Sequence, residues 1–455
     1  MSNAVRELEV RLDSYDAKER GAALSTLAGL IDEVCEPADD NGDVNMHCHS
    51  FFSYNADGWS PSRIAWECRK RGLLAAGLCD FDVLDGLEEF IEAGHLLGLR
   101  TAVHLETRAF FDTFASVDIN SPGEPGVNYV MGTGFYRSFA EGTPQAETLA
   151  ELRQGATQRN QELIARINAK IPQVALDYQR DVLPLTPRGV ATERHIIRAY
   201  GVAGQRIFPD TNTRAAFWAP LLKLSTEAAA ELERDTPKFD EALRGALAKR
   251  GGVGYKQPDT TTFPPIGKFT AWVNSCGAIP TATWLDGTSG GEADCARWLE
   301  ALIDYGCAVV AFIPDRNWNL KNRQDREVKI AKMDELVRES VKRDMPLIIG
   351  TEMNKKGLPF ADDLNGPVLS KYSELFRDGA KFIVGQTILG RYAAMPYLSE
   401  RAAAAWPSAS KRNEFYTKVG GLPPLDRADA EALQAAGPDK AFGMLADKIE
   451  LSTGA

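Results

Sequence analysis

The chain has 455 residues, of which 44% are hydrophobic and 25% are charged, and its formal net charge at pH 7 is −11. These proportions are typical of a globular protein with a large core. The excess of acidic residues argues against non-specific binding to nucleic acid or to an anionic membrane. A local basic pocket for one phosphate group remains compatible with this charge.

Seven cysteines lie at positions 35, 48, 68, 79, 276, 295 and 307, and none has CxxC spacing. An odd and dispersed set indicates reduced thiols in a cytosolic protein, not a disulfide framework. The first twenty residues are charged and lack the apolar segment of a signal peptide. No run reaches the ~18 apolar residues that span a bilayer. We therefore expect a cytoplasmic protein with no membrane association.

An apolar stripe predicts helix over residues 4–33, and we expect 1–42 to form an N-terminal helical extension. Short apolar segments then alternate with amphipathic segments that predict helices. The expected strands are 44–48, 73–79, 101–105, 277–284, 308–314, 346–350 and 381–384. Such alternation predicts a parallel sheet. The expected fold class is α/β, a distorted (β/α)7 TIM-like barrel over residues 43–398.

The alternation is interrupted between about residues 112 and 270, where we expect an insertion packed on the barrel. Residues 118–145 are rich in Gly, Pro and Asn and predict loop, whereas 149–170 predict a long helix. Residues 399–455 are Ala-rich and predict a C-terminal helical extension. The sequence does not define the fold of the insertion.

Polar residues follow the expected strands, and such barrels build their active sites at the carboxyl ends of the strands. The chain has only five histidines, and His47 and His49 end the first strand. Because they are one residue apart, their side chains point to the same face and can bind one metal ion. The alternative for the two histidines is an incidental surface pair. The alternative for the polar residues after the other strands is a role as turn residues or helix caps.

Further donors follow the later strands. His195 stands three residues after the expected helix cap Thr192, where a neutral imidazole is favoured. The alternative role of His195 is a bond to a neighbouring carboxylate. The alternative for Glu106 is a simple ion pair, and the alternative for Asp57 is an ordinary Asp-Gly turn. The predicted metal ligands are His47, His49, Asp57, Asp80, Asp82, Glu106, His195, Glu352 and Asn354.

These residues resemble the motifs of the PHP (polymerase and histidinol phosphatase) superfamily. His-Cys-His at 47–49, followed by Ser53 and Asp57-Gly58, resembles its first motif, and Cys-Asp-Phe-Asp at 79–82 its second, T-D-H-D. Glu106 resembles the bridging glutamate of the third motif, and Thr-Glu-Met-Asn at 351–354 the final D-x-H. The resemblance covers 43–110 closely and 270–395 more loosely. It implies a distorted barrel with two or three divalent metals and mostly phosphoesterase activity.

The departures from this pattern reduce the expected number of metals. Phe81 and Asn354 replace two histidines of the family, and Gln386 offers no imidazole. We therefore expect one or two ions of Zn, Mn or Fe with mixed nitrogen and oxygen ligands.

Catalytic roles are assigned to four residues. Arg194 and Arg316 are predicted to bind phosphoryl oxygens, with an ion pair to a nearby aspartate as the alternative. Asp82 or Asp286 is predicted to accept the proton of the attacking water.

The expected function is a metal-dependent hydrolase, a phosphoesterase that uses metal-activated water on a small phosphorylated metabolite. One alternative is amidohydrolase-like cleavage of a C–N or C–O bond on the same barrel. The other is a binding protein whose site has decayed. The substrate, the metal and the oligomeric state stay open.

Overall fold

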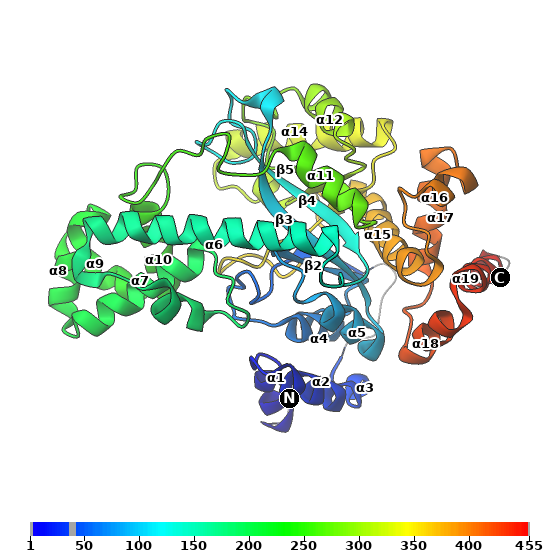
Figure 1. The fold of residues 1–455 in the computed structure, drawn as a ribbon, viewed down its shortest axis with the longest axis horizontal. Coiled ribbons are helices and arrows are strands. Elements are labelled where there is room, and N and C mark those ends of the chain that lie inside the picture. The colour runs from blue at the N-terminus through cyan, green and yellow to red at the C-terminus, as the bar shows by residue number, and fades with distance from the viewer. Residues whose placement is uncertain (1–2, 36–41, 454–455) are drawn as a thin grey trace.

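The structure is a computed structural model that describes residues 3–35 and 42–453 (Figure 1). Its sheet has seven strands, and their order across the sheet is their order along the chain. They are β1 (Val44–Cys48), β2 (Ala75–Phe81), β3 (Arg100–Phe110), β4 (Val127–Phe135), β5 (Ile279–Trp284), β6 (Val309–Phe312) and β7 (Leu347–Ile349). A parallel bridge between Cys48 and Glu352, just beyond β7, joins the two edges. The sheet is therefore a nearly closed barrel.

The barrel is mixed because β4 runs antiparallel to both β3 and β5, whereas the other neighbouring pairs are parallel. The prediction of loop over 118–145 was wrong at β4. Its glycines were read as turn residues, but Gly132 lies so close to Phe135 and Val273 that a Cβ would meet each of them at 2.8 Å. Close packing, and not a turn, accounts for this glycine.

The predicted strand at 381–384 was also wrong, because these residues lie inside α15 (Ser373–Ala393). A short apolar run does not distinguish a buried helix from a buried strand. This helix contacts β1, β2, β3, β4 and β7. Gln386 donates to the carbonyl of Gly277, just before β5, so α15 covers the end of the barrel where the parallel strands begin. The end that carries His47 and His49 is the opposite one.

Helices that follow or precede the strands cover the outside of the barrel. They are α4 (Pro61–Lys70), α5 (Leu87–Leu97), α11 (Ile266–Ser275), α12 (Cys295–Asp304), α13 (Asp315–Trp318) and α14 (Arg323–Lys342). Ser60 caps α4 by accepting from the Arg63 amide, as its Ser-Pro start predicts. Short helical turns occupy Asp112–Phe114, Pro172–Val174, Tyr178–Val182, Leu183–Leu185 and Ser370–Tyr372.

The described parts of the two predicted extensions, residues 3–35 and 399–453, are largely helical and pack on the barrel core. Residues 1–2, 36–41 and 454–455 of the predicted extensions lie outside the described residues. The helix expected over 4–33 is divided into α1 (Asn3–Arg11), α2 (Ala17–Ala28) and α3 (Ile31–Val34). The C-terminal helices are α16 (Glu400–Ala405), α17 (Ala409–Gly421), α18 (Arg427–Ala436) and α19 (Pro438–Thr453). Within the described ranges no helix combines the length and the apolar character needed to cross a membrane.

The insertion forms a helical lobe beside the barrel, which we define as α7 (Glu193–Ile207), α8 (Thr211–Leu222), α9 (Thr226–Glu233) and α10 (Thr236–Leu247) with the second half of α6 (Pro144–Lys170). Figure 1 shows α6 extending from the barrel into this lobe. The lobe has its own apolar core, which includes Ile167, Tyr200, Trp218 and Leu243. The predicted long helix over 149–170 is thus confirmed as part of α6.

Asp362, in the loop after β7, is a carboxyl group that the fold buries to 1% exposure. Burial, together with the negative charge of the nearby Asp315, raises its pKa from 3.8 to about 8. Because the folded pKa exceeds the unfolded one, the native state holds a proton that the unfolded state loses between pH 4 and pH 8. The free energy of unfolding therefore falls as pH rises through this window.

We expect Asp362→Asn to stabilise the protein at pH 7–8 and to reduce the fall of the free energy of unfolding with pH. One such group contributes a slope of at most about 1.4 kcal/mol per pH unit. Urea unfolding at several pH values measures it. Asp325→Asn, at an exposed position on α14, is the control. An Asp362→Asn variant with the pH dependence of the parent would contradict a protonated native carboxyl.

Candidate metal centre

Two strands bring together three of the predicted metal ligands. His47 and His49 lie at the end of β1, and Glu106 lies on β3, opposite Phe81 of β2. Each imidazole Nε2 is 3.5 Å from Glu106 Oε2, and the three ligand atoms lie within 4.8 Å of one another. Donors bound at 2.0–2.1 Å to a tetrahedral zinc ion stand about 3.3–3.4 Å apart. The observed spacing therefore fits coordination of one ion.

The same three atoms are buried without a hydrogen bond. Among the described residues, none provides a hydrogen-bond partner for His47 Nε2, His49 Nε2 or Glu106 Oε2. Buried polar atoms are normally paired, because leaving one unpaired costs about 1–3 kcal/mol. Three such atoms that face one another are explained by a cation between them. The donor set of two imidazoles and one carboxylate fits a divalent transition metal.

A hydrogen-bonded chain fixes the tautomer of His49. The hydroxyl of Ser53 donates to Asp80 Oδ1 at 2.6 Å, so its only proton is used there. His49 Nδ1 lies 3.0 Å from the hydroxyl oxygen of Ser53 and must then donate to it. His49 Nε2 is therefore left with a free lone pair. Asp80 also accepts from the amide and hydroxyl of Ser50. Asp80 thus positions a metal ligand through Ser53.

Electrostatics keep Glu106 ionised in this buried position. Burial alone would raise its pKa, but His47 and His49 lower it to about 2. Burial would likewise lower the pKa of His47, yet Glu106 and Glu352 outweigh it and raise that pKa. Loss of the carboxylate would therefore weaken both the charge and the geometry of the ligand set.

Phe81 stacks on His49, with the ring centroids 4.7 Å apart and the planes inclined by 15°. An aromatic hydrocarbon offers no metal ligand, so Phe81 fixes the imidazole plane instead. Its side chain also lines the cavity in front of the metal centre.

Glu352 lies beside the histidines but binds other groups. Its backbone exchanges hydrogen bonds with His47 and His49, and its φ of +64° is left-handed. Its carboxylate accepts from Arg316 at 2.7 Å and from Asn354 at 3.3 Å. All three residues line the cavity. None of them belongs to the group of three donors.

Asp82 lines the cavity as well, but its carboxylate is held elsewhere. Thr107 donates to it at 2.5 Å, and Arg159 lies 3.5 Å from it. Burial raises its pKa, although Arg159 and Thr107 oppose the shift. Its backbone amide donates to the carbonyl of Glu106, so Asp82 is next to the metal centre.

Five predicted residues lie outside the cavity lining. Two of them, His49 and Asp80, belong to the group of donors and its support, and the other three bond to different parts of the protein. His195 forms a capping box with Thr192, accepting the Thr192 amide on Nδ1, and burial lowers its pKa to about 4. Asp57 pairs with Lys356. Asp286 pairs with Lys329 at 2.6 Å.

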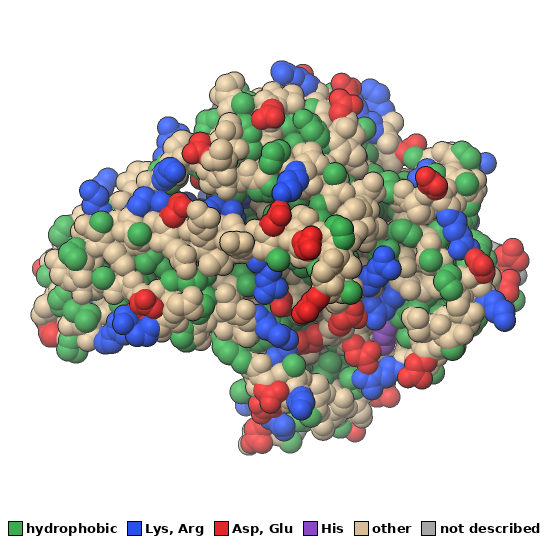
Figure 2. All heavy atoms as spheres, viewed as in Figure 1, with side chains coloured by type: hydrophobic (Ala, Val, Ile, Leu, Met, Phe, Trp, Pro, Cys, Tyr) green, Lys and Arg blue, Asp and Glu red, His purple; other side chains and the backbone are tan. Residues whose placement is uncertain are grey.

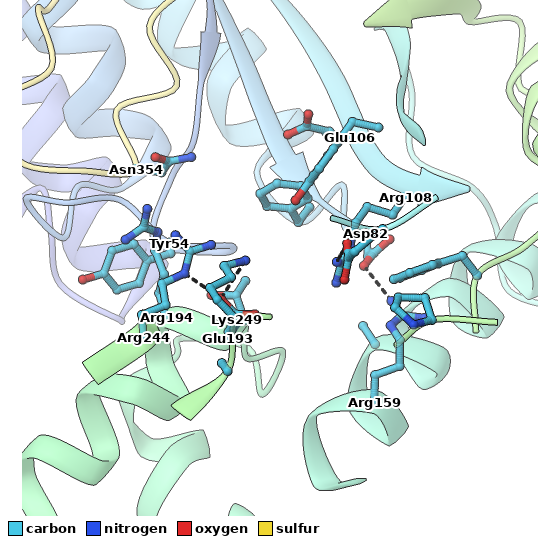
Figure 3. Close-up of a pocket in the computed structure, with 18 of the residues that line it drawn as sticks. Tyr54, Asp82, Glu106, Arg108, Arg159, Glu193, Arg194, Arg244, Lys249 and Asn354 are labelled. Carbon is cyan, nitrogen blue, oxygen red and sulfur yellow. Dashed lines mark hydrogen bonds and ion pairs between the residues drawn. The ribbon is translucent and has the colours of Figure 1, made fainter. Parts of the chain in front are cut away.

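The cavity lies between the barrel and the helical lobe and has a volume of about 390 Å³ (Figure 3). Residues from the metal centre, β3, α6 and the lobe line it. Its acidic lining residues are Asp82, Glu106, Glu124, Glu162, Glu193 and Glu352. Its basic lining residues are Arg108, Arg159, Arg166, Arg194, Arg244, Lys249, Lys256 and Arg316.

Sequence reasoning predicted Arg194 and Arg316 in this lining but missed the other basic residues. Arg108 stacks on Phe263, with its guanidinium carbon 4.3 Å from the ring centroid, and Arg159 stacks on the same ring at 4.8 Å. Sequence reasoning also gave no role to Ser53 beyond the motif. Its spacing of four residues from His49 was the one available signal.

Comparison with known proteins identifies no family. No family model matches the sequence, and no curated protein does. The chain is similar to the structure of a protein proposed to be a metal-dependent phosphoesterase from Bifidobacterium adolescentis, with 18% identity, a TM-score of 0.46, and coverage of 75% of this chain and 98% of the other. It is also similar to an amidohydrolase from Chromobacterium violaceum with bound sulfate and no metal, with 13% identity, a TM-score of 0.47, and coverage of 73% and 96%. Both TM-scores are below 0.5, so the functional argument rests on the residues of the site.

We expect Ser53→Ala to weaken metal binding by roughly 10–100-fold, because His49 loses the acceptor that fixes its tautomer. Competition with a chromophoric chelator measures the affinity. The matched control is Ser340→Ala, which removes another fully buried hydroxyl, one without a hydrogen bond in the described structure. Equal affinities in Ser53→Ala and the parent would refute the positioning role.

Proposed function

We propose that the protein is a metal-dependent hydrolase that cleaves a phosphoric ester of a small metabolite. The observation that carries the proposal is the set of three buried, unpartnered donor atoms at the edge of a cavity with many basic residues. The resemblance of the motifs around His47, Glu106 and Glu352 to the PHP superfamily supports it.

One divalent ion is proposed at this centre, held by His47, His49 and Glu106. When bound, such an ion lowers the pKa of water and neutralises charge on phosphoryl oxygens. The other oxygen donors of the predicted set have protein partners. Asp80 accepts from Ser50 and Ser53, Asp82 from Thr107, and Glu352 from Arg316. These contacts support one ion over two.

The chain supplies the remaining groups around the substrate. Arg316 lies beside the metal centre, and its planar guanidinium matches phosphoryl oxygens with two parallel donors. Asp82 is the proposed proton acceptor, because it lines the cavity next to Glu106, whereas Asp286 does not line it. Burial raises the pKa of Asp82, which makes its carboxylate a stronger base.

An amide-cleaving hydrolase would use the same metal centre and needs fewer basic groups. A carboxylic amide carries no phosphoryl charge, so eight basic lining residues favour a phosphorylated substrate. A panel of amides and esters beside phosphorylated metabolites separates the two. Hydrolysis of amides alone would select the amidohydrolase-like alternative.

Elemental analysis of protein purified without added metal or affinity-tag nickel is the primary test. We expect about one equivalent of Zn, Mn or Fe, lost in the His47→Ala/His49→Ala variant. His95→Ala is the control, because His95 bonds Tyr392 outside the cavity lining. Absence of metal even after reconstitution would favour a binding protein with a decayed site.

Arg316→Ala is expected to lower kcat/KM for phosphoesters by roughly 10–100-fold, because a charge-assisted bond to the substrate is lost. Arg316→Lys restores the charge but not the fork and should recover only part of the activity. Metal content should not change. The control is Arg323→Ala, an exposed guanidinium on α14. Unchanged kinetics in Arg316→Ala would exclude it from the substrate site.

A further inference from the structure

The helical lobe contributes its own basic group to the cavity. Arg194 lies in the first turn of α7, Arg244 lies on α10, and Lys249 lies just after α10. All three line the cavity. In Figure 3 they lie together with Glu193, apart from Glu106 of the metal centre. We call Arg194, Arg244 and Lys249 the lobe cations.

Two carboxylates hold the lobe cations in place. Glu193 accepts from Arg244 at 2.5 Å and lies 3.2 Å from Lys249. Glu241 accepts from Arg194 at 3.1 Å and from Arg244 at 3.3 Å. Three cations thus share two carboxylates, which leaves one positive charge in excess. Side chains fixed in this way lose little freedom when they bind an anion.

The positive charge is crowded as well as fixed. Partial burial in the cavity lowers the pKa of Lys249, and Arg244 and Arg108 oppose its protonation further, against the pull of Glu193. An anion bound between these groups would relieve the repulsion. The arrangement therefore favours a negatively charged ligand on this wall of the cavity.

The charge of the cavity differs from that of the molecule. The lining has eight basic and six acidic residues, whereas the whole chain has a net charge of −11. On the face seen in Figure 2, basic and acidic side chains are interspersed. Basic groups are thus concentrated in the cavity, on the wall formed by the lobe as well as beside the metal centre.

We propose that the substrate carries a second anionic group, a phosphate or a carboxylate, and that the lobe cations bind it. This inference rests on the proposed function, since the first anionic group is the phosphoryl group at the metal centre. Arg194, predicted from the sequence to bind the reacting phosphoryl group, is assigned to the second group instead. The lobe cations are then specificity-determining residues.

The ion pair between Glu193 of α7 and Arg244 of α10 already connects the two helices. A purely structural role therefore does not require Lys249, which is nearly half exposed and faces the cavity. Replacement of Lys249 therefore tests ligand recognition without removing the contact that connects the two helices.

Matched phosphoesters test the inference with the metal-loaded protein. Glycerol 3-phosphate and 3-phosphoglycerate form one pair, and fructose 6-phosphate and fructose 1,6-bisphosphate form another. We expect kcat/KM at least about tenfold higher for the member with two anionic groups. Lys249→Met should remove most of that preference and change kcat/KM for the other member less than about twofold. The control is Lys268→Met, an exposed lysine on α11 paired with Glu151.

Binding distinguishes failure of this inference from failure of the proposed function. Calorimetric titration of the same compounds into the His47→Ala/His49→Ala protein, with and without Lys249→Met, reports recognition without turnover. A preference in binding that depends on Lys249, without hydrolysis by the metal-loaded protein, would refute the hydrolase and support the second anion site. Equal binding and equal turnover within each pair, or equal losses on both members, would overturn the inference.

Discussion

Three buried atoms that lie close together without a hydrogen bond, His47 Nε2, His49 Nε2 and Glu106 Oε2, are the constraint on which the site depends. A carboxylate between two imidazoles would be costly to bury in any arrangement that did not fix all three. The chain fixes them from three sides, through the backbone pairing of Glu352 with β1, the stacking of Phe81, and the link from Asp80 through Ser53 to His49. The backbone pairing of Glu352 with β1 therefore both closes the barrel and fixes the strand end that carries the two histidines.

The rest of the cavity follows from the position of the lobe. The barrel alone presents Arg108 and Arg316 near the donors, and most of the other basic groups come from the insertion or from α6. The proposed function divides two chemical tasks between two parts of the fold. It assigns bond cleavage to the strand ends, and recognition of the remaining substrate to helices that have a separate apolar core.

Much of the barrel was predictable because local patterns agree with the tertiary structure. Six of the seven expected strands are present, with ends shifted by at most two residues except that β3 extends five residues further, to Phe110. The seventh place belongs to β4, whose Gly132 is explained by the side chains of Phe135 and Val273 packed against it. Three of the four residues at 381–384 are apolar and buried, because α15 packs against strands of the barrel and against α17. That environment cannot be recognised from four residues.

The site was predictable to the extent that its residues are neighbours in sequence or follow strands. His47, His49 and Glu106 meet these conditions, and the structure places them together. His195 follows a helix cap and not a strand, and its ring completes the cap of its own helix. Arg108, Arg244 and Lys249 carried no signal, since their convergence depends on how a long helical insertion folds back over the barrel.

The helix α6 gives the cavity a fixed width. At about 1.5 Å per residue, its 27 residues form a rod of about 40 Å. Its first turn is bonded to α11 on the barrel, through the Trp272 indole and the Gln145 carbonyl, and Ile164 and Ile167 lie in the core of the lobe. A continuous helix anchored at both ends resists bending, so the two walls keep a constant separation. For the proposed substrate with two anionic groups, a constant separation of the walls favours ligands whose charges lie at the matching distance, largely independently of their overall shape.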